Sequence, residues 1–226
     1  MELKTQNHPE KSLETEAVIV FNELLKNPAI VEALNLLDSL PKNLKYHDKG
    51  HTLDVMKETI LFALADELDR KTIELQTIAA AWHDVGYLKE YNNNEPIAVE
   101  MFQKSKAFQT LSTEEKAEII ANILDTQIIM KDDKLFLLKQ RSKLGYILDG
   151  DVSSFGREDF FEKRMEIAEE LGLDLSNVEI KKKFYASGIN LLRNHEWKTE
   201  SAKKLRQAQK EINLRKLEEE YAKLLK

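Results

Sequence analysis

Three segments of the chain combine histidines and aspartates at spacings that suit chemistry. The first, YHDKGH at 46–51, places two imidazoles four residues apart, which puts them near one face of a helix start. The second, AAAWHD at 79–84, ends a strongly apolar stretch with a His-Asp pair, and the third, ILDGD at 147–151, ends another with two carboxylates. The spacing therefore predicts that imidazoles and carboxylates gather at helix ends.

These residue types are the usual ligands of a divalent metal ion. Neutral imidazole and carboxylate suit Mn, Fe, Ni, Co or Zn, whereas Mg prefers oxygen ligands. Two histidines and two aspartates leave coordination positions open on a six-coordinate ion. One open position can hold a water and lower its pKa, and another can take a phosphoryl oxygen. The residues thus predict a divalent metal ion that takes part in hydrolysis.

Each motif taken alone has an ordinary explanation. A His-Asp dipeptide occurs by chance, a histidine pair at this spacing is commonly a surface feature, and an acid at a helix end is usually solvated. The His-Asp pair at 83–84 is harder to explain in this way, because charge against a buried face costs several kcal/mol unless it is paired or metal-bound. Asp151 and Asp149 both stay candidates for the last carboxylate ligand, and Asp151 is preferred.

Helices must position these residues. Helix-forming residues dominate, the chain has only 7 glycines and 4 prolines, and no segment shows convincing strand alternation. We therefore expect an all-α fold of roughly nine to ten helices in one domain, 1–226. Its core would span about 44–195, with N-terminal helices in 15–40 and a C-terminal helix at 199–226 packed on it. The expected helices cover about 15–26, 28–40, 50–68, 71–83, 95–106, 112–125, 133–149, 157–171, 176–193 and 199–226.

Composition narrows the function classes. The formal net charge of −6 provides no overall basic field for nucleic acid. The absence of cysteine excludes disulfides, thiolate metal sites and cysteine nucleophiles. The polar N-terminus does not resemble a signal peptide, and no apolar run approaches the ~20 residues that span a bilayer. We expect a cytoplasmic protein without nucleic-acid or membrane partners, with a homodimer contact through 199–226 as an open alternative.

The order of the three motifs resembles the HD-domain superfamily of metal-dependent phosphohydrolases, whose pattern is H…HD…D on a helical bundle. YHDKGHTLDVM resembles the family's YHNxxHxxxV, AAAWHDVGYL its AAxxHDxGY, and LDGDVSSFGREDF its DADLxxLGxxDF segment. NHEWKTESAKKLR resembles a C-terminal segment of one bacterial branch. The resemblance extends over about 44–210.

The resemblance implies a role for individual residues. His51, His83, Asp84 and Asp151 match the metal ligands. His47 matches a histidine that faces the substrate and can protonate the leaving oxygen, and a structural role is its alternative.

Departures from the family pattern bear on the number of metal ions. Asp48 stands where the family has Asn, and Asn93-Asn94-Glu95 stands where many relatives have a His-Glu pair. Dinuclear members take further histidines from a helix near 118–127, where this chain has Asn122, Asp125 and Thr126. We therefore expect one metal ion per chain, or two if Glu95 or Asp125 contributes a carboxylate.

The expected reaction is hydrolysis of a phosphate ester, with a nucleotide as the substrate. Metal-activated water would attack phosphorus, Asp84 or Glu95 would orient that water, and His47 would protonate the leaving group. The side chains expected to bind substrate are Lys89, Tyr87, Arg157 and His195, with Lys49, Arg193 and Tyr91 as weaker candidates. The ordinary alternatives are surface charges for the cations and a helix C-cap for His195.

Two other functions stay open. The same fold can keep its metal and sense a nucleotide without turnover. A purely structural helical scaffold would leave four buried ionisable groups unexplained.

Overall fold

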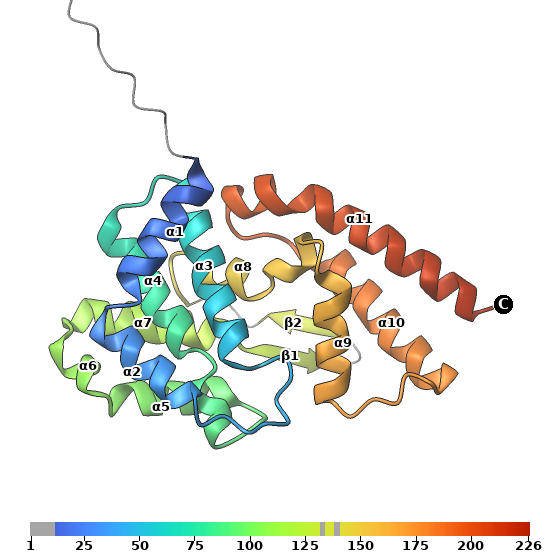
Figure 1. Cartoon of the computed structure of the whole chain (residues 1–226), viewed down its shortest axis with the longest axis horizontal. Helices are drawn as coiled ribbons and strands as arrows, with labels where there is room; N and C mark the ends of the chain where they lie inside the picture. The colour runs from blue at the N-terminus through green and yellow to red at the C-terminus, as the bar shows by residue number, and fades with distance from the viewer. Residues whose placement is uncertain (1–11, 132–133, 138–140) are drawn as a thin grey trace, which may run out of the picture.

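The computed structural model describes residues 12–131, 134–137 and 141–226, and its fold is all-α apart from one short hairpin (Figure 1). Nine of the α-helices in those residues have ten or more residues, which agrees with the expected nine to ten. The elements are α1 (Leu13–Leu24), α2 (Pro28–Leu37), α3 (Lys49–Ala65), α4 (Arg70–Trp82), the 3-10 helix η1 (Val85–Leu88), α5 (Asn94–Gln103), α6 (Lys106–Thr110), α7 (Thr113–Asp125), β1 (Ile128–Lys131), β2 (Lys134–Leu137), α8 (Tyr146–Asp151), the 3-10 helix η2 (Ser153–Gly156), α9 (Phe160–Glu170), α10 (Val178–Asn194) and α11 (Glu200–Leu224).

Polar side chains cap the starts of several helices. Ser112 and Glu115 form a capping box at α7, and the Thr199 hydroxyl accepts the Ala202 N–H at the start of α11. At α10 the cap is Asn177, whereas the expected helix began at 176.

The predicted helix at 133–149 is wrong. β1 and β2 pair as an antiparallel hairpin in the register Ile128 with Leu137, and α8 occupies only Tyr146–Asp151. Runs such as IIM at 128–130 and LFL at 135–137 are short and continuously apolar. Such runs favour strand and buried helix equally by periodicity, so only their pairing decides between the two.

Helix α3 lies at the centre of the helical packing. α3 packs against α8, α4 and α1, and the largest apolar cluster lies among α1 to α5 and α7 (Figure 1). A second apolar cluster joins η2, α9, α10 and α11 around Phe155, Phe160, Ile189, Leu192 and Leu217. The start of α3 and the end of α8 lie between these clusters. Among the described residues, no helix is both long enough and apolar enough to cross a bilayer.

Candidate metal centre

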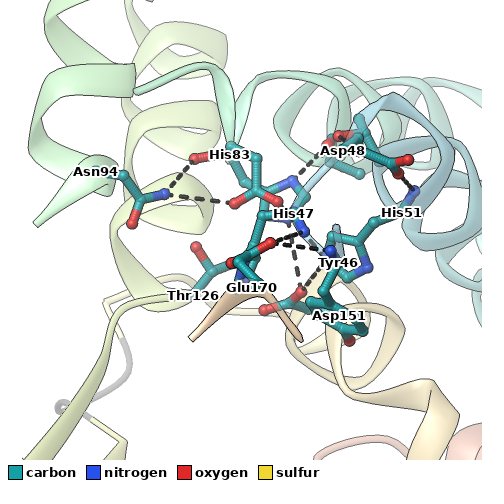
Figure 2. A network of polar contacts seen from close by, with 12 residues as sticks. Tyr46, His47, Asp48, His51, His83, Asn94, Thr126, Asp151 and Glu170 are labelled. Atoms are coloured by element: carbon teal, nitrogen blue, oxygen red, sulfur yellow. Dashed lines mark hydrogen bonds and ion pairs between the residues drawn. The ribbon is translucent and has the colours of Figure 1, made fainter. Parts of the chain in front are cut away.

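The predicted ligands meet where α3, α4 and α8 come together. His51, His83 and Asp84 are buried, and one ligand atom from each lies within 4.8 Å of the others. Asp151 adjoins this group, because its Oδ1 lies 3.0 Å from His51 Nε2 and 3.6 Å from His83 Nε2 (Figure 2). The cluster could hold a metal ion, as the sequence predicted.

Local hydrogen bonds hold the backbone at His51 and the ring of His83. Asp48 caps α3 by accepting the His51 N–H at 2.9 Å, so it does the capping that an Asn would do at this position. His83 directly follows α4, and its Nδ1 donates to the Ala80 carbonyl at 2.7 Å. That bond leaves Nε2 as the ligating nitrogen, which is the usual arrangement of a metal-bound histidine.

Two glycines in the motifs allow segments distant in sequence to approach. A Cβ at Gly150 would lie 2.6 Å from Thr59 Oγ1, so the glycine lets α8 lie against α3 and brings Asp151 beside His51. A Cβ at Gly86 would lie 1.8 Å from the Asn94 carbonyl oxygen. This close approach lets the Asn94 amide donate to Asp84 Oδ1 at 3.4 Å.

The donor set fits a divalent cation. Among the described residues, neither His83 Nε2 nor Asp84 Oδ2 has a hydrogen-bond partner, although the two atoms lie only 3.2 Å apart. Burial opposes charge on His83, but Asp84 and Asp151 hold its pKa well above the ordinary value, and the pKa values of both carboxyls are lowered by the histidines. The buried Asp84 and the partly buried Asp151, together with two imidazole nitrogens, form an N/O set suited to Mn, Fe, Co, Ni or Zn.

The structure separates the two candidate carboxylates. The Asp149 carboxylate accepts the backbone N–H groups of Lys198 and Thr199 and the Thr199 hydroxyl, so it fastens the start of α11. Burial raises its pKa to about 6, against the opposing effect of these hydrogen bonds. Asp151 is therefore the carboxylate that faces the histidines, and Asp149 has a structural contact instead.

A cavity of about 400 Å³ opens beside the metal ligands. Three of the residues predicted for catalysis or substrate binding line it together with His83 and Asp84, namely His47, Tyr87 and Glu95. Burial raises the pKa of Glu95, and nearby Asp84 and Asp151 act in the same direction. The remaining wall includes Tyr91, Asn92, Asn93, Asn94, Thr126, Gln127, Ile167 and Leu171.

Three other predicted substrate contacts do not line this cavity. Arg157 forms ion pairs with Asp159 and Asp54, and Lys89 is an exposed side chain. His195 is half-buried in the second apolar cluster, edge-on to two aromatic rings, and burial lowers its pKa to about 3. The ion pairs of Arg157 and the packing of His195 depend on residues distant in sequence, so the sequence alone could not predict them.

Most of the residues considered as ligands of a second metal ion form hydrogen bonds with other groups instead. The Asp125 carboxylate accepts the backbone N–H groups of Arg141 and Ser142, each at 2.7 Å. The Asn122 amide donates to the carbonyl of Glu118. Of the two carboxylates proposed for this role, only Glu95 lines the cavity.

Two residues of the site were missed by the sequence. Asn94 was seen only as a departure from a family pattern, yet it contacts Asp84. Glu170 contacts His47 across 123 residues of chain, and its position near the end of a helix carried no motif that could have identified it.

Comparisons with known protein families, curated proteins and solved structures found no match to this chain. The candidate site therefore has to be interpreted from its own geometry.

Proposed function

We propose that this protein is a metal-dependent phosphohydrolase of the HD-domain kind, which hydrolyses the phosphate ester of a nucleotide. The observation that carries the proposal is the meeting of His51, His83, Asp84 and Asp151 at the edge of a cavity that also contains His47 and Glu95. Ligands from three separate helices converge there, in the order that the resemblance implies.

Each residue of the site has a part in the proposed hydrolysis. When bound, a divalent metal ion polarises a phosphoryl oxygen and makes water a better nucleophile at neutral pH. Glu95 accepts a proton from the attacking water, and its raised pKa suits a general base. As the water oxygen bonds to phosphorus, the bond to the leaving oxygen breaks and His47 donates a proton to it. The products are an alcohol and a phosphate group.

The walls of the cavity support a nucleotide as substrate. The rings of Tyr87 and Tyr91 pack edge to face with centroids 5.4 Å apart, and Asn93 and Gln127, joined by one amide hydrogen bond, add polar groups to the wall. Aromatic rings stack on bases, and amides donate to and accept from their edges. A volume of about 400 Å³ lies within the usual range for small-molecule sites.

The proposed site holds one metal ion per chain. Among the described residues, Glu95 is the cavity carboxylate beyond Asp84 and Asp151, and we assign it to the water. Asp125 is fully occupied by backbone donors. A second ion would lack its own set of ligands.

Metal content and turnover test the proposal together. Metal bound to purified protein is quantified, and a panel of phosphate esters is assayed with added Mn²⁺. Wild type is compared with His83→Ala and Asp84→Ala, and Glu90→Gln serves as the control because Glu90 is an exposed acid outside the cavity lining. We expect one ion per chain in wild type and the control, with loss of ion and of turnover in both site variants.

The outcomes separate the functions. A wild-type protein that binds no divalent ion refutes the metal site. Bound metal without hydrolysis of any ester refutes the enzyme and favours a nucleotide sensor. Turnover that persists in both site variants means that hydrolysis occurs elsewhere.

A further inference from the structure

Glu170 connects two walls of the cavity from a third element. It is the last residue of α9, and its side chain is only 1% exposed. Its carboxylate reaches the turn before α3, where Tyr46 and His47 lie (Figure 2). It also accepts the hydroxyl of Tyr91, which lies beyond η1. Burial of an acid is tolerated when its charge is paired and hydrogen-bonded, and Glu170 finds its partners in two other segments of the chain.

Among the described residues, the hydrogen-bond partners of the Glu170 carboxylate are all donors. Oε2 accepts the backbone N–H groups of Lys45, Tyr46 and His47 at 2.9, 2.9 and 3.0 Å. Oε1 lies 2.5 Å from His47 Nδ1 and accepts the Tyr91 hydroxyl at 2.9 Å. A carboxylate accepts at both oxygens, whereas a glutamine would turn an NH₂ group toward one of these sets of donors. The site therefore requires a carboxylate and not merely a side chain of this size.

These contacts determine the orientation of His47. Because a carboxylate only accepts, Nδ1 of the imidazole carries the proton in this bond. The ring also stacks on Tyr87 with centroids 4.7 Å apart. Nε2 has no hydrogen bond to a described residue, and His47 lines the cavity. The nitrogen opposite Glu170 is thus the one left to act on a ligand.

The geometry points to Glu170 as the positioning residue of this site, which holds the His47 imidazole with Nδ1 bonded and Nε2 available to the ligand. Its catalytic consequence rests on the proposed function, because only a hydrolase would use His47 as a proton donor. Glu170 itself does not line the cavity, so it acts through His47 and Tyr91.

Glu170→Gln tests this role, and Glu169→Gln is its matched control. Glu169 is the preceding residue, and it forms only an exposed ion pair with Lys45 at 3.3 Å. The first measurement needs no substrate: ¹⁵N NMR of the histidine rings in the full-length protein. We expect the His47 Nδ1 proton to be hydrogen-bonded in wild type and in Glu169→Gln, and to lose that bond in Glu170→Gln. Stoichiometric metal binding should be the same in all three proteins.

The second measurement is turnover of whichever ester wild type hydrolyses. Positioning partners of this kind are worth about 10- to 100-fold, so kcat should fall by that factor in Glu170→Gln with little change in KM. The double variant His47→Ala with Glu170→Gln should be no slower than His47→Ala alone. A merely structural role would instead slow the double variant further.

The two failures are distinguishable. If wild type hydrolyses nothing, the proposed function fails, and the NMR result still decides whether Glu170 orients His47. An unchanged His47 ring signal in Glu170→Gln would overturn the inference, as would additive losses in the double variant. If Glu170→Gln does not fold, Tyr91→Phe replaces it as a milder variant that removes one donor from Oε1. The His47 bond should then persist, and its loss would show that Tyr91 rather than Glu170 holds the ring.

Discussion

Gly86→Ala should damage the metal centre through a collision with the backbone. The added Cβ would lie 1.8 Å from the Asn94 carbonyl oxygen and 2.6 Å from its carbon, where ordinary contact begins at 3.4 Å. Either η1 or the start of α5 has to move by more than 1 Å. Overpacking of this kind costs typically 1–3 kcal/mol, and backbone atoms cannot rotate away, so we expect about 3 kcal/mol.

The displacement also reaches the ligands. The Asn94 amide donates to Asp84 Oδ1, and loss of such a partner lowers metal affinity about 10- to 100-fold. For a chain of this size each kcal/mol shifts the melting temperature by about 2–4 °C, so the metal-free variant should melt about 6–12 °C lower. Calorimetry gives both numbers, from thermal scans of metal-free protein and from Mn²⁺ titrations.

Gly156→Ala is the matched control for this prediction. A Cβ there would lie 2.4 Å from the Arg206 carbonyl oxygen, a comparable backbone collision against α11. It should lower the melting temperature by a similar amount and leave metal affinity within about twofold. The reasoning fails if Gly86→Ala binds metal like wild type, or if Gly156→Ala loses affinity equally.

Three further predictions follow from the charges in the structure. Asp125→Asn should lower the free energy of unfolding by about 2 kcal/mol, because the Asp125 carboxylate accepts two backbone N–H groups. The number of metal ions per chain should not change, and a lower number by metal analysis would contradict our assignment. Divalent metal at 100 times its Kd should add about 2.7 kcal/mol, about 5–11 °C in the melting temperature. This shift should be smaller at pH 5.5 than at pH 8, because neighbouring carboxylates raise the pKa of His83 and its proton competes with metal; a larger shift at pH 5.5 would refute this. Burial opposes ionisation of Glu170, but the hydrogen bond and charge of His47 and the backbone N–H groups together lower its pKa to about 2. The free energy of unfolding that ionised Glu170 contributes is therefore complete above about pH 4.5 and is lost as the pH falls toward 2. Urea unfolding of wild type and Glu170→Gln at pH 3 and 5.5 checks this, and an equal difference at both values would argue against it.

The sequence alone determined the features that depend on residues close together along the chain. Helix propensity predicted the all-α fold, and the expected helix starts at 112 and 199 are the capping residues of α7 and α11. The His-Asp motif predicted His83 and Asp84, and the resemblance selected His51 from the two histidines of the first motif. These three residues meet as one buried group. These signals are local, so a single sequence carries them.

Tertiary structure decided whatever depends on which surfaces meet. Two apolar runs that could also have formed a helix pair with each other as a hairpin. Asp149 binds the start of α11, so Asp151 is the carboxylate that faces the histidines. Arg157 forms ion pairs that the sequence did not predict, and Glu170 contacts His47 across 123 residues of chain. Burial and hydrogen-bond or ion-pair partners depend on segments distant in sequence that pack together, so no local pattern of residue types could predict them.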